Sequence, residues 1–331
     1  MSELRQDPIS SRWVVIAKDR AGRPDEFQPA PFRRVAATCP FCFGHEDETP
    51  LAVATYPPDT VAGERWKVRV VPNRYPAVKL DERPAPESHL PFALGESRGG
   101  FGVHEVIIES PDHAVSFTEL SDELVEWTFA VYRDRLQTLA RDRRFRYAQI
   151  FKNVGALGCA SIEHIHSQLV ATNFVPADMQ TELNGSRAWH DRTGACPFCQ
   201  LIEAELAAGL RIVSATERCV AFCPYASRFP YETWVLPRRH ASQFEKTEAG
   251  ELGEAARFVR DIIGRIERAS GRSAYNYFLH TSPFDAGPLD HYHWHVEIFP
   301  RITTAAGYEW ATGCFINPVP PEDAAAKLST P

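Results

Sequence analysis

The tetrapeptide CPFC stands at residues 39–42 and again at residues 196–199, close to half of the 331-residue chain apart. The segments that follow the two copies also correspond. VPNRYPA (71–77) and VHEVIIESPDH (103–113) follow the first copy, and CPYASRFP (223–230) and ETWVLPRRH (232–240) follow the second. A correspondence over this length indicates that one structural unit occurs twice.

Each half continues with one helix and two strands. Apolar residues at helical spacing predict helices over 121–142 and 251–268. Strand-like runs follow at 145–153 and 275–281, and each half then reaches a histidine-rich strand, HIHSQLVA (164–171) or HYHWHVEIF (291–299). We therefore predict an α+β fold, a duplicated unit of antiparallel sheets with flanking helices, divided into residues 1–175 and 176–331.

Two stretches are expected to be irregular. Gly and Pro are frequent in 21–65, which predicts long loops around the first unit, and a proline-containing stretch at 173–195 is expected to join the halves.

Composition excludes several classes of function. The net charge is −7 and the pI is about 6.0, so nothing favours binding to nucleic acid. The sequence lacks an apolar run of about 18 residues and a signal-peptide core at its N-terminus, so we expect a cytoplasmic protein without a membrane span.

The two CPFC copies predict two metal sites. Zinc prefers four Cys or His ligands in a tetrahedron, and each Cys pair supplies two of them. The repeat supplies the others, so the predicted sets are Cys39, Cys42, His113 and His164 in the first half and Cys196, Cys199, His240 and His293 in the second. A closed Cys2His2 site is structural, because it leaves no position for a reactive water. A redox role for a Cys-x-x-Cys pair is the alternative.

The strand at 164–171 carries the predicted chemistry. Alternate residues of a strand share a face, so His164, His166 and Gln168 are expected to point the same way. With His164 on zinc, His166 is held with a free ring nitrogen that can attack phosphorus. Gln168 can donate its amide N–H to a phosphoryl oxygen. The preceding Gly-containing run, with Ser161, suits phosphate binding. A core strand with satisfied histidines is the structural alternative.

Together these motifs resemble the galactose-1-phosphate uridylyltransferase family of the histidine-triad superfamily. The resemblance covers nearly the whole chain and rests on residues 7–24, CPFC, VPNRYPA, ESPDH (109–113), FKN (151–153), HIHSQ (164–168), AGYE (306–309) and TGCFINP (312–318). It implies a homodimer of duplicated histidine-triad units and ping-pong nucleotidyl transfer through His166, with a sugar nucleotide and a sugar 1-phosphate as substrates.

The resemblance also implies roles for further residues. Asn153 and Ser161 match contacts to the nucleotide phosphates, Asn73 matches a nucleotide-binding segment, and Arg20 and Arg23 match arginines near the phosphates. Tyr308 and Glu309 match a sugar-contacting pair that is contributed across the dimer.

Departures from the family pattern keep the nucleotide open. Glu163 and Ile165 replace the prolines that flank the first histidine in the best-known uridylyltransferases, and the second Cys pair is absent there. Both CPFC copies and TGCFINP are closer to a branch with plant ADP-glucose:phosphate adenylyltransferase-like proteins. We expect a UDP-glucose–hexose-1-phosphate uridylyltransferase with two zinc ions per chain. The alternatives are an ADP-glucose phosphorylase or adenylyltransferase and a non-catalytic zinc protein that binds nucleotides.

Overall fold

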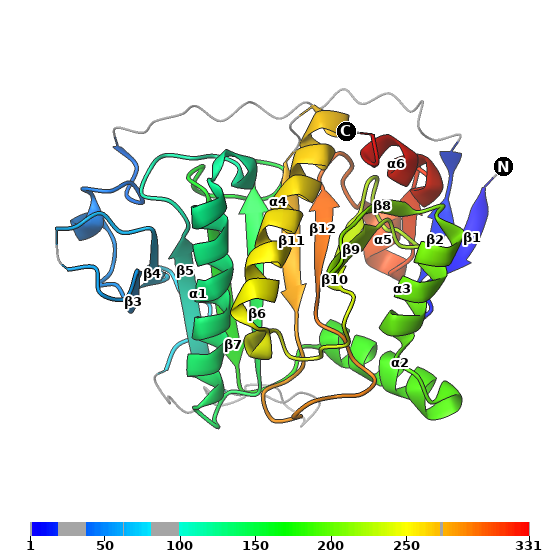
Figure 1. Ribbon diagram of the computed structural model, residues 1–331, viewed down its shortest axis with the longest axis horizontal. Helices are drawn as coiled ribbons and strands as arrows, with labels where there is room; N and C mark the ends of the chain where they lie inside the picture. The colour runs from blue at the N-terminus through cyan, green and yellow to red at the C-terminus, as the bar shows by residue number, and fades with distance from the viewer. Residues whose placement is uncertain (1, 19–37, 62, 81–98, 272–273, 331) are drawn as a thin grey trace, which may run out of the picture.

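A single large antiparallel sheet forms the centre of the molecule (Figure 1). The computed structural model describes residues 2–18, 38–61, 63–80, 99–271 and 274–330. Within these ranges ten strands pair in the order β3-β4-β5-β7-β6-β11-β12-β10-β9-β8. Their bounds are β3 Ala54–Tyr56, β4 Val68–Pro72, β5 Gly102–Ile108, β6 Tyr147–Val154, β7 His166–Thr172, β8 Ile212–Ala215, β9 Cys219–Phe222, β10 Thr233–Pro237, β11 Tyr275–His280 and β12 His295–Pro300.

The strand order is symmetric about the central pair β6 and β11. β7 and β12 flank this pair, β5 and β10 follow, and β4 and β9 come next. The register is symmetric as well, because Phe151 lies opposite Gln168 in the first half and Phe278 lies opposite Glu297 in the second. The predicted duplication is therefore confirmed. Gln168 therefore corresponds to Glu297, and His166, two residues before Gln168, corresponds to His295.

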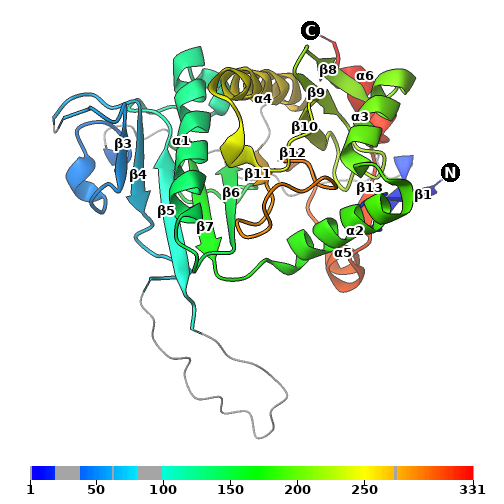
Figure 2. The same cartoon turned by 60° about the horizontal axis from the view of Figure 1, so that its bottom comes forward.

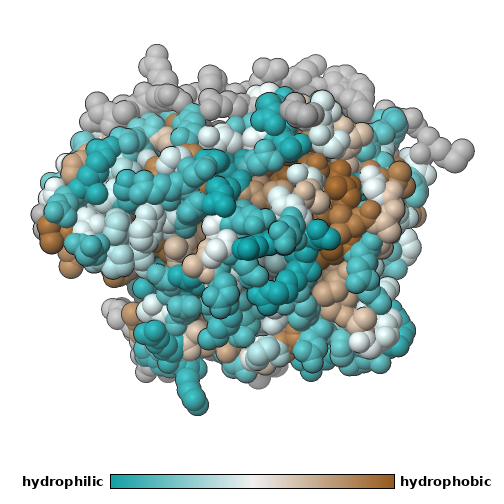
Figure 3. Space-filling model, viewed as in Figure 1, coloured by the Kyte–Doolittle hydropathy of each residue, from teal (hydrophilic) through white to brown (hydrophobic). Residues whose placement is uncertain are grey.

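Helices α1 Asp122–Ala140 and α4 Ala249–Ser270 lie side by side over one face of the sheet (Figure 1). Both confirm predicted helices. The Ser121 hydroxyl caps α1 by accepting from the Leu124 amide, and Gly271 ends α4 in the left-handed region at φ 74°. Their apolar sides are buried, while the outer surface over them is predominantly hydrophilic (Figure 3).

The stretch at 173–195, expected to be irregular, contains a helix, so that prediction was wrong. Helix α2 Ala177–Thr193 begins after Pro176 and ends at Gly194, which is left-handed at φ 73°. A proline before a helix and a glycine after it are boundary signals, and here they delimit a helix instead of marking a loop. The predicted boundary between residues 175 and 176 falls between β7 and α2.

The expectation of long loops over 21–65 is only partly met. Residues 21–37 lie outside the described part of the chain. The rest contains a 3-10 helix, η3 Glu46–Glu48, and strand β3, whose Tyr56 pairs with Val68 of β4 at the edge of the large sheet.

The chain ends come together in a second, three-stranded sheet. Its order is β1 Glu3–Gln6, β2 Trp13–Ile16 and β13 Phe315–Asn317. Helices α3 Pro197–Ala208, α5 Gly307–Thr312 and α6 Pro321–Leu328 and the 3-10 helices η4 Phe117–Glu119 and η5 Phe244–Lys246 complete the described elements. Figures 1 and 2 show α2, α3 and α5 on the side of the molecule that holds the second half of the sheet, away from β7. Among the described helices, none has the length and apolar character needed to cross a membrane.

Candidate functional site

The four residues of the first predicted metal set converge. Cys39 and Cys42 lie in one tight turn, in which the Cys42 amide donates to the Cys39 carbonyl. His164 Nδ1 lies 3.5 Å from Cys39 Sγ and 3.6 Å from Cys42 Sγ, and His113 Nδ1 lies 3.5 Å from Cys42 Sγ. Zn–S and Zn–N bonds of ordinary length give a tetrahedral edge of about 3.5 Å between sulfur and nitrogen. The set therefore has the spacing of a zinc site.

The surroundings of these ligands also suit a metal. The second ring nitrogen of His164 donates to the Ser110 carbonyl at 2.9 Å, which leaves Nδ1 as the ligand atom. Among the described residues, none accepts a hydrogen bond from the buried His113 Nε2, and the Glu163 carboxylate lies 4.0 Å away from it. Burial, with the neighbouring Cys39, raises the pKa of the Cys42 thiol to about 12. Two adjacent buried thiolates need a cation, which a bound metal supplies.

His164 lies before the strand, although the sequence predicted a strand from residue 164. Strand β7 begins at His166. Between His164 and His166, the Ile165 amide donates to the carbonyl of Ala114, the residue that follows His113, at 2.7 Å. This backbone hydrogen bond joins the start of β7 to the segment that follows His113.

The second predicted set repeats this geometry. Cys199 Sγ lies 3.4 Å from His240 Nδ1 and 3.7 Å from His293 Nδ1. His240 Nε2 donates to the Leu289 carbonyl and His293 Nε2 to the Pro237 carbonyl. Cys196 completes the group, whose possible ligand atoms lie within 4.8 Å of one another.

His293 also precedes its strand, so the predicted strand at 291–299 starts too early. Strand β12 begins at His295. The Trp294 amide donates to the Ala241 carbonyl at 2.8 Å, as the Ile165 amide does to Ala114 in the first half.

His166 is buried at the start of β7 with one ring nitrogen engaged. Its Nδ1–H donates to the His164 carbonyl at 2.7 Å, so Nε2 carries the lone pair. Burial lowers the pKa of the imidazole, and the nearby Lys152 cation acts in the same direction. A neutral imidazole with a fixed ring and a free Nε2 is the form that a nucleophile needs.

Polar side chains from three strands surround Gln168. Asn73, just beyond β4, and His104 of β5 both approach its Oε1, at 3.4 Å and 2.8 Å. Asn153 lies on β6, two residues beyond the strand partner of Gln168, and its Oδ1 accepts from Asn276 at 2.8 Å. The structure therefore brings Asn73, Asn153 and Gln168 to one face of the sheet beside His166.

Other predicted binding residues are placed differently. Ser161 is exposed in the irregular segment between β6 and β7. This segment starts at Gly155, which is left-handed at φ 75°. Arg20 and Arg23 lie outside the described residues. Tyr308, half-exposed at 50%, and Glu309 lie on α5, and within one chain they are far from β7 (Figure 2). The Glu309 carboxylate accepts from the Ala306 amide at 2.9 Å.

A polar network on the opposite face of β7 was not predicted from the sequence. Glu109 accepts hydrogen bonds from Lys152, Ser167 and Tyr132, and the Tyr132 hydroxyl also contacts that of Tyr277. The Lys152 and Glu109 side chains are both fully buried. The charge of Lys152, next to the apolar residue Phe151 in a predicted strand, was the available signal. The network anchors the residue that follows His166.

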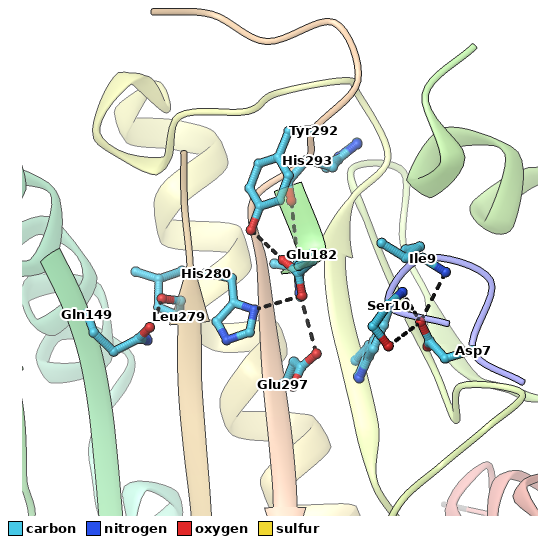
Figure 4. Close-up of polar contacts among 12 residues, drawn as sticks. Asp7, Ile9, Ser10, Gln149, Glu182, Leu279, His280, Tyr292, His293 and Glu297 are labelled. Atoms are coloured by element: carbon cyan, nitrogen blue, oxygen red, sulfur yellow. Dashed lines mark hydrogen bonds and ion pairs between the residues drawn. The ribbon is translucent and has the colours of Figure 1, made fainter. Parts of the chain in front are cut away.

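A third cluster was also missed, because Glu182 comes from the stretch expected to be irregular. Glu182, His280, His295 and Glu297 place possible ligand atoms within 4.8 Å of one another. Figure 4 shows His280 and Tyr292 turned toward Glu182. His280 Nδ1 lies 3.3 Å from the Glu182 carboxylate, and His295 Nε2 lies 3.6 Å from Glu297. The donor set can hold a cation, although Arg228 already pairs with Glu297 at 2.6 Å.

This third cluster occupies the place in the second half that His166 and Gln168 occupy in the first. His295 corresponds to His166, and Glu297 to Gln168. His295 Nδ1 donates to the His293 carbonyl at 3.0 Å, but its Nε2 faces the carboxylates of Glu182 and Glu297. Carboxylates repel a phosphate, so this arrangement does not suit a nucleotide.

Comparison with known proteins gives two matching family models. Residues 2–176 match the galactose-1-phosphate uridyl transferase N-terminal domain, and residues 109–330 match a domain of unknown function, DUF4921. The chain is 32% identical over 330 residues to the ADP-glucose phosphorylase of Arabidopsis thaliana, covering 98% of this chain and 91% of that protein. It is 30% identical over 337 residues to the galactose-1-phosphate uridylyltransferase of Thermotoga maritima, covering 99% and 98%.

A solved structure agrees with these matches. The crystal structure of an Arabidopsis thaliana ADP-glucose phosphorylase with bound ADP-glucose superimposes with a TM-score of 0.86 at 30% identity, covering 100% of this chain and 99% of that one.

Proposed function

The chain belongs to the galactose-1-phosphate uridylyltransferase family of nucleotidyltransferases, and from this membership we propose that it transfers a nucleotidyl group from a sugar nucleotide through a covalent intermediate on His166. The observation that carries the proposal is the state of the His166 ring. Its Nδ1–H is bound to the His164 carbonyl, which directs the lone pair of Nε2 outward beside Gln168.

The transfer has two balanced steps. His166 Nε2 attacks the α-phosphorus of the sugar nucleotide, the bond from this phosphorus to the bridging oxygen breaks, and a sugar 1-phosphate leaves. A phosphate oxygen of the acceptor then attacks the same phosphorus and displaces His166. While the ring carries the nucleotidyl group it is positively charged, and the His164 carbonyl that accepts from Nδ1–H stabilises that charge.

Gln168, Asn73, Asn153 and Ser161 are proposed to bind the phosphates and the nucleoside. Because Asn153 Oδ1 accepts from Asn276, its amide N–H groups are left to face the site. Arg20 and Arg23 are proposed to pair with the phosphates, for which a guanidinium is suited.

Two zinc ions per chain are proposed, one in each Cys2His2 set. A bound zinc supplies structural cross-linking, not chemistry on the substrate, because each set is closed. In the first set, His164 joins the metal to β7 two residues before the nucleophile, so this site holds the strand in place.

The relatives of this chain support two different nucleotides, one with uracil and one with adenine. The sequence motifs and the relative in Thermotoga maritima support UDP-glucose with a hexose 1-phosphate as acceptor. The relative in Arabidopsis thaliana and its structure with bound ADP-glucose support ADP-glucose, with inorganic phosphate as acceptor. We propose UDP-glucose first and ADP-glucose as the second candidate.

A homodimer is proposed as well. Tyr308 and Glu309 lie far from β7 in their own chain, so a sugar-binding role requires a partner subunit. The half-exposed Tyr308 is available for such a contact.

Intact-protein mass spectrometry after incubation with UDP-glucose or ADP-glucose tests the proposal. Wild type should gain the mass of one UMP or one AMP per chain, and the gain identifies the nucleotide. His166→Asn, which can still donate to the His164 carbonyl but lacks Nε2, should gain nothing. His295→Asn makes the same change at the corresponding position of the second half and should be labelled normally. An adduct on His166→Asn, or none on wild type with either sugar nucleotide, would contradict the proposed function.

A further inference from the structure

The orientation of the Gln168 amide decides what this residue can do. Its Nε2 can donate to a phosphoryl oxygen, whereas its Oε1 would repel one. The two atoms are nearly equal in size, so shape alone does not choose between them. The choice must come from the hydrogen-bonding neighbours of Gln168.

His104 is the first of these neighbours, and the backbone fixes its tautomer. It lies on β5 diagonally across from Gln168, because Val106 is the direct strand partner. The Ala77 amide donates to His104 Nδ1 at 3.1 Å, so in the neutral ring the proton is on Nε2. Nε2 lies 2.8 Å from Gln168 Oε1 and donates to it.

Asn73 is the second neighbour and is also fixed by the backbone. The Tyr75 amide donates to Asn73 Oδ1 at 2.8 Å, which turns Nδ2 toward Gln168 Oε1 at 3.4 Å. The backbone N–H of Asn73 in turn donates to the backbone carbonyl of His104 at 2.8 Å. Asn73 Nδ2 and His104 Nε2, 3.1 Å apart, thus converge as donors on one oxygen.

We infer that His104, assisted by Asn73, is a positioning residue that holds Gln168 with its amide N–H groups turned toward the transferred phosphoryl group. This inference rests on the proposed nucleotidyl transfer at His166. Within the described part of the chain, Gln168 Nε2 has no protein acceptor, so both of its N–H groups are left for a substrate.

The second half shows the contrast. By strand register, Glu232 corresponds to His104 and Glu297 to Gln168, since Trp234 pairs with Glu297 as Val106 pairs with Gln168. There Arg228 lies between the two carboxylates, 3.2 Å from Glu232 and 2.6 Å from Glu297. This half therefore offers acceptors where the first half offers a donor.

The test compares two variants of nearly equal size. His104→Gln can keep a donor near the position of Nε2, whereas His104→Glu presents acceptors alone and should reverse the Gln168 amide. In single-turnover formation of the His166 adduct, His104→Gln should remain within about 10-fold of wild type. His104→Glu should be slower by about 100- to 1,000-fold, the range for loss of one preorganised donor. Zinc content and the KM for the sugar nucleotide should change far less.

The same pair in a Gln168→Ala background separates positioning from a structural role. Without the Gln168 amide, the difference in rate between His104→Gln and His104→Glu should shrink, leaving only the repulsion between the new carboxylate and the phosphates. Equal rates in the wild-type background, or an undiminished difference in the Gln168→Ala background, would overturn the inference while leaving nucleotidyl transfer intact. No adduct on wild type with UDP-glucose or ADP-glucose would instead overturn the proposed function, and this inference with it.

Discussion

Replacement of Lys152 by Met tests the buried network beneath strand β7. Lys152 and Glu109 are fully buried and bonded to each other, and Glu109 also accepts from Ser167, the neighbour of His166. Met keeps most of the side-chain volume but removes the ammonium group. Removing one partner of a buried ion pair costs about 3–5 kcal/mol, because the other charge is left uncompensated.

For a chain of 331 residues, the entropy of unfolding near Tm is about 0.7 kcal/mol/K, so that loss corresponds to a fall of roughly 4–7 °C in Tm. Lys152→Met/Glu109→Gln should recover most of it, because Gln can still accept from Ser167 and leaves no buried charge. Lys67→Met is the matched control. Lys67 pairs with Glu123 at 3.0 Å on the surface, where such a pair contributes about 0–1 kcal/mol.

Differential scanning calorimetry of the zinc-loaded proteins measures these differences. Zinc content is determined in parallel, so that metal loss is not mistaken for loss of the ion pair. The reasoning is refuted if Lys152→Met melts within about 2 °C of Lys67→Met, a margin of about 1.4 kcal/mol. It is equally refuted if the double variant melts no higher than the single one.

Three further predictions follow from the same structure. Burial lowers the pKa of Lys152 to about 8 from its ordinary 10.5, so between these pH values the unfolded chain binds more protons than the folded chain. The free energy of unfolding of wild type, relative to that of Lys152→Met/Glu109→Gln, should therefore rise as the pH increases from 8 to 10.5. Chemical denaturation measures this difference, and a difference that does not change with pH would contradict the prediction. Cys196→Ala should lower the zinc content from about two to about one per chain by atomic absorption and leave His166 labelling in place, whereas Cys39→Ala should abolish labelling as well as one zinc; equal effects of the two variants would argue against separate sites. Arg228→Met should destabilise the protein by about 3–5 kcal/mol, because Glu232 and Glu297 lose their shared cation, and an unchanged Tm would show that these carboxylates are not charged together.

The repeated motifs were sufficient to predict the fold class and the two Cys2His2 groups that the structure brings together. Cys and His are rare side chains, and a duplication presents each pattern of them twice, so the Cys pairs pointed to the histidines that lie beside them in the structure. Helices α1 and α4 were predicted for a similar reason, since each must bury one apolar side against the sheet. Irregular backbone was predicted where α2 lies, because its boundary residues, Pro176 and Gly194, are as typical of loops as of helix ends.

Other features depended on strand register and on side chains from distant segments. His104 faces Gln168 because β5 lies beside β7 with Val106 opposite Gln168, a pairing that no local pattern specifies. Glu182 meets His280 and His295 because α2 packs near β11 and β12, which lie about 100 residues further along the chain. Local sequence determined which residues can bind metal or attack phosphorus, since that depends on side-chain chemistry and spacing. Only the tertiary structure determined which donors orient them, because hydrogen bonds across a sheet depend on how its strands are aligned.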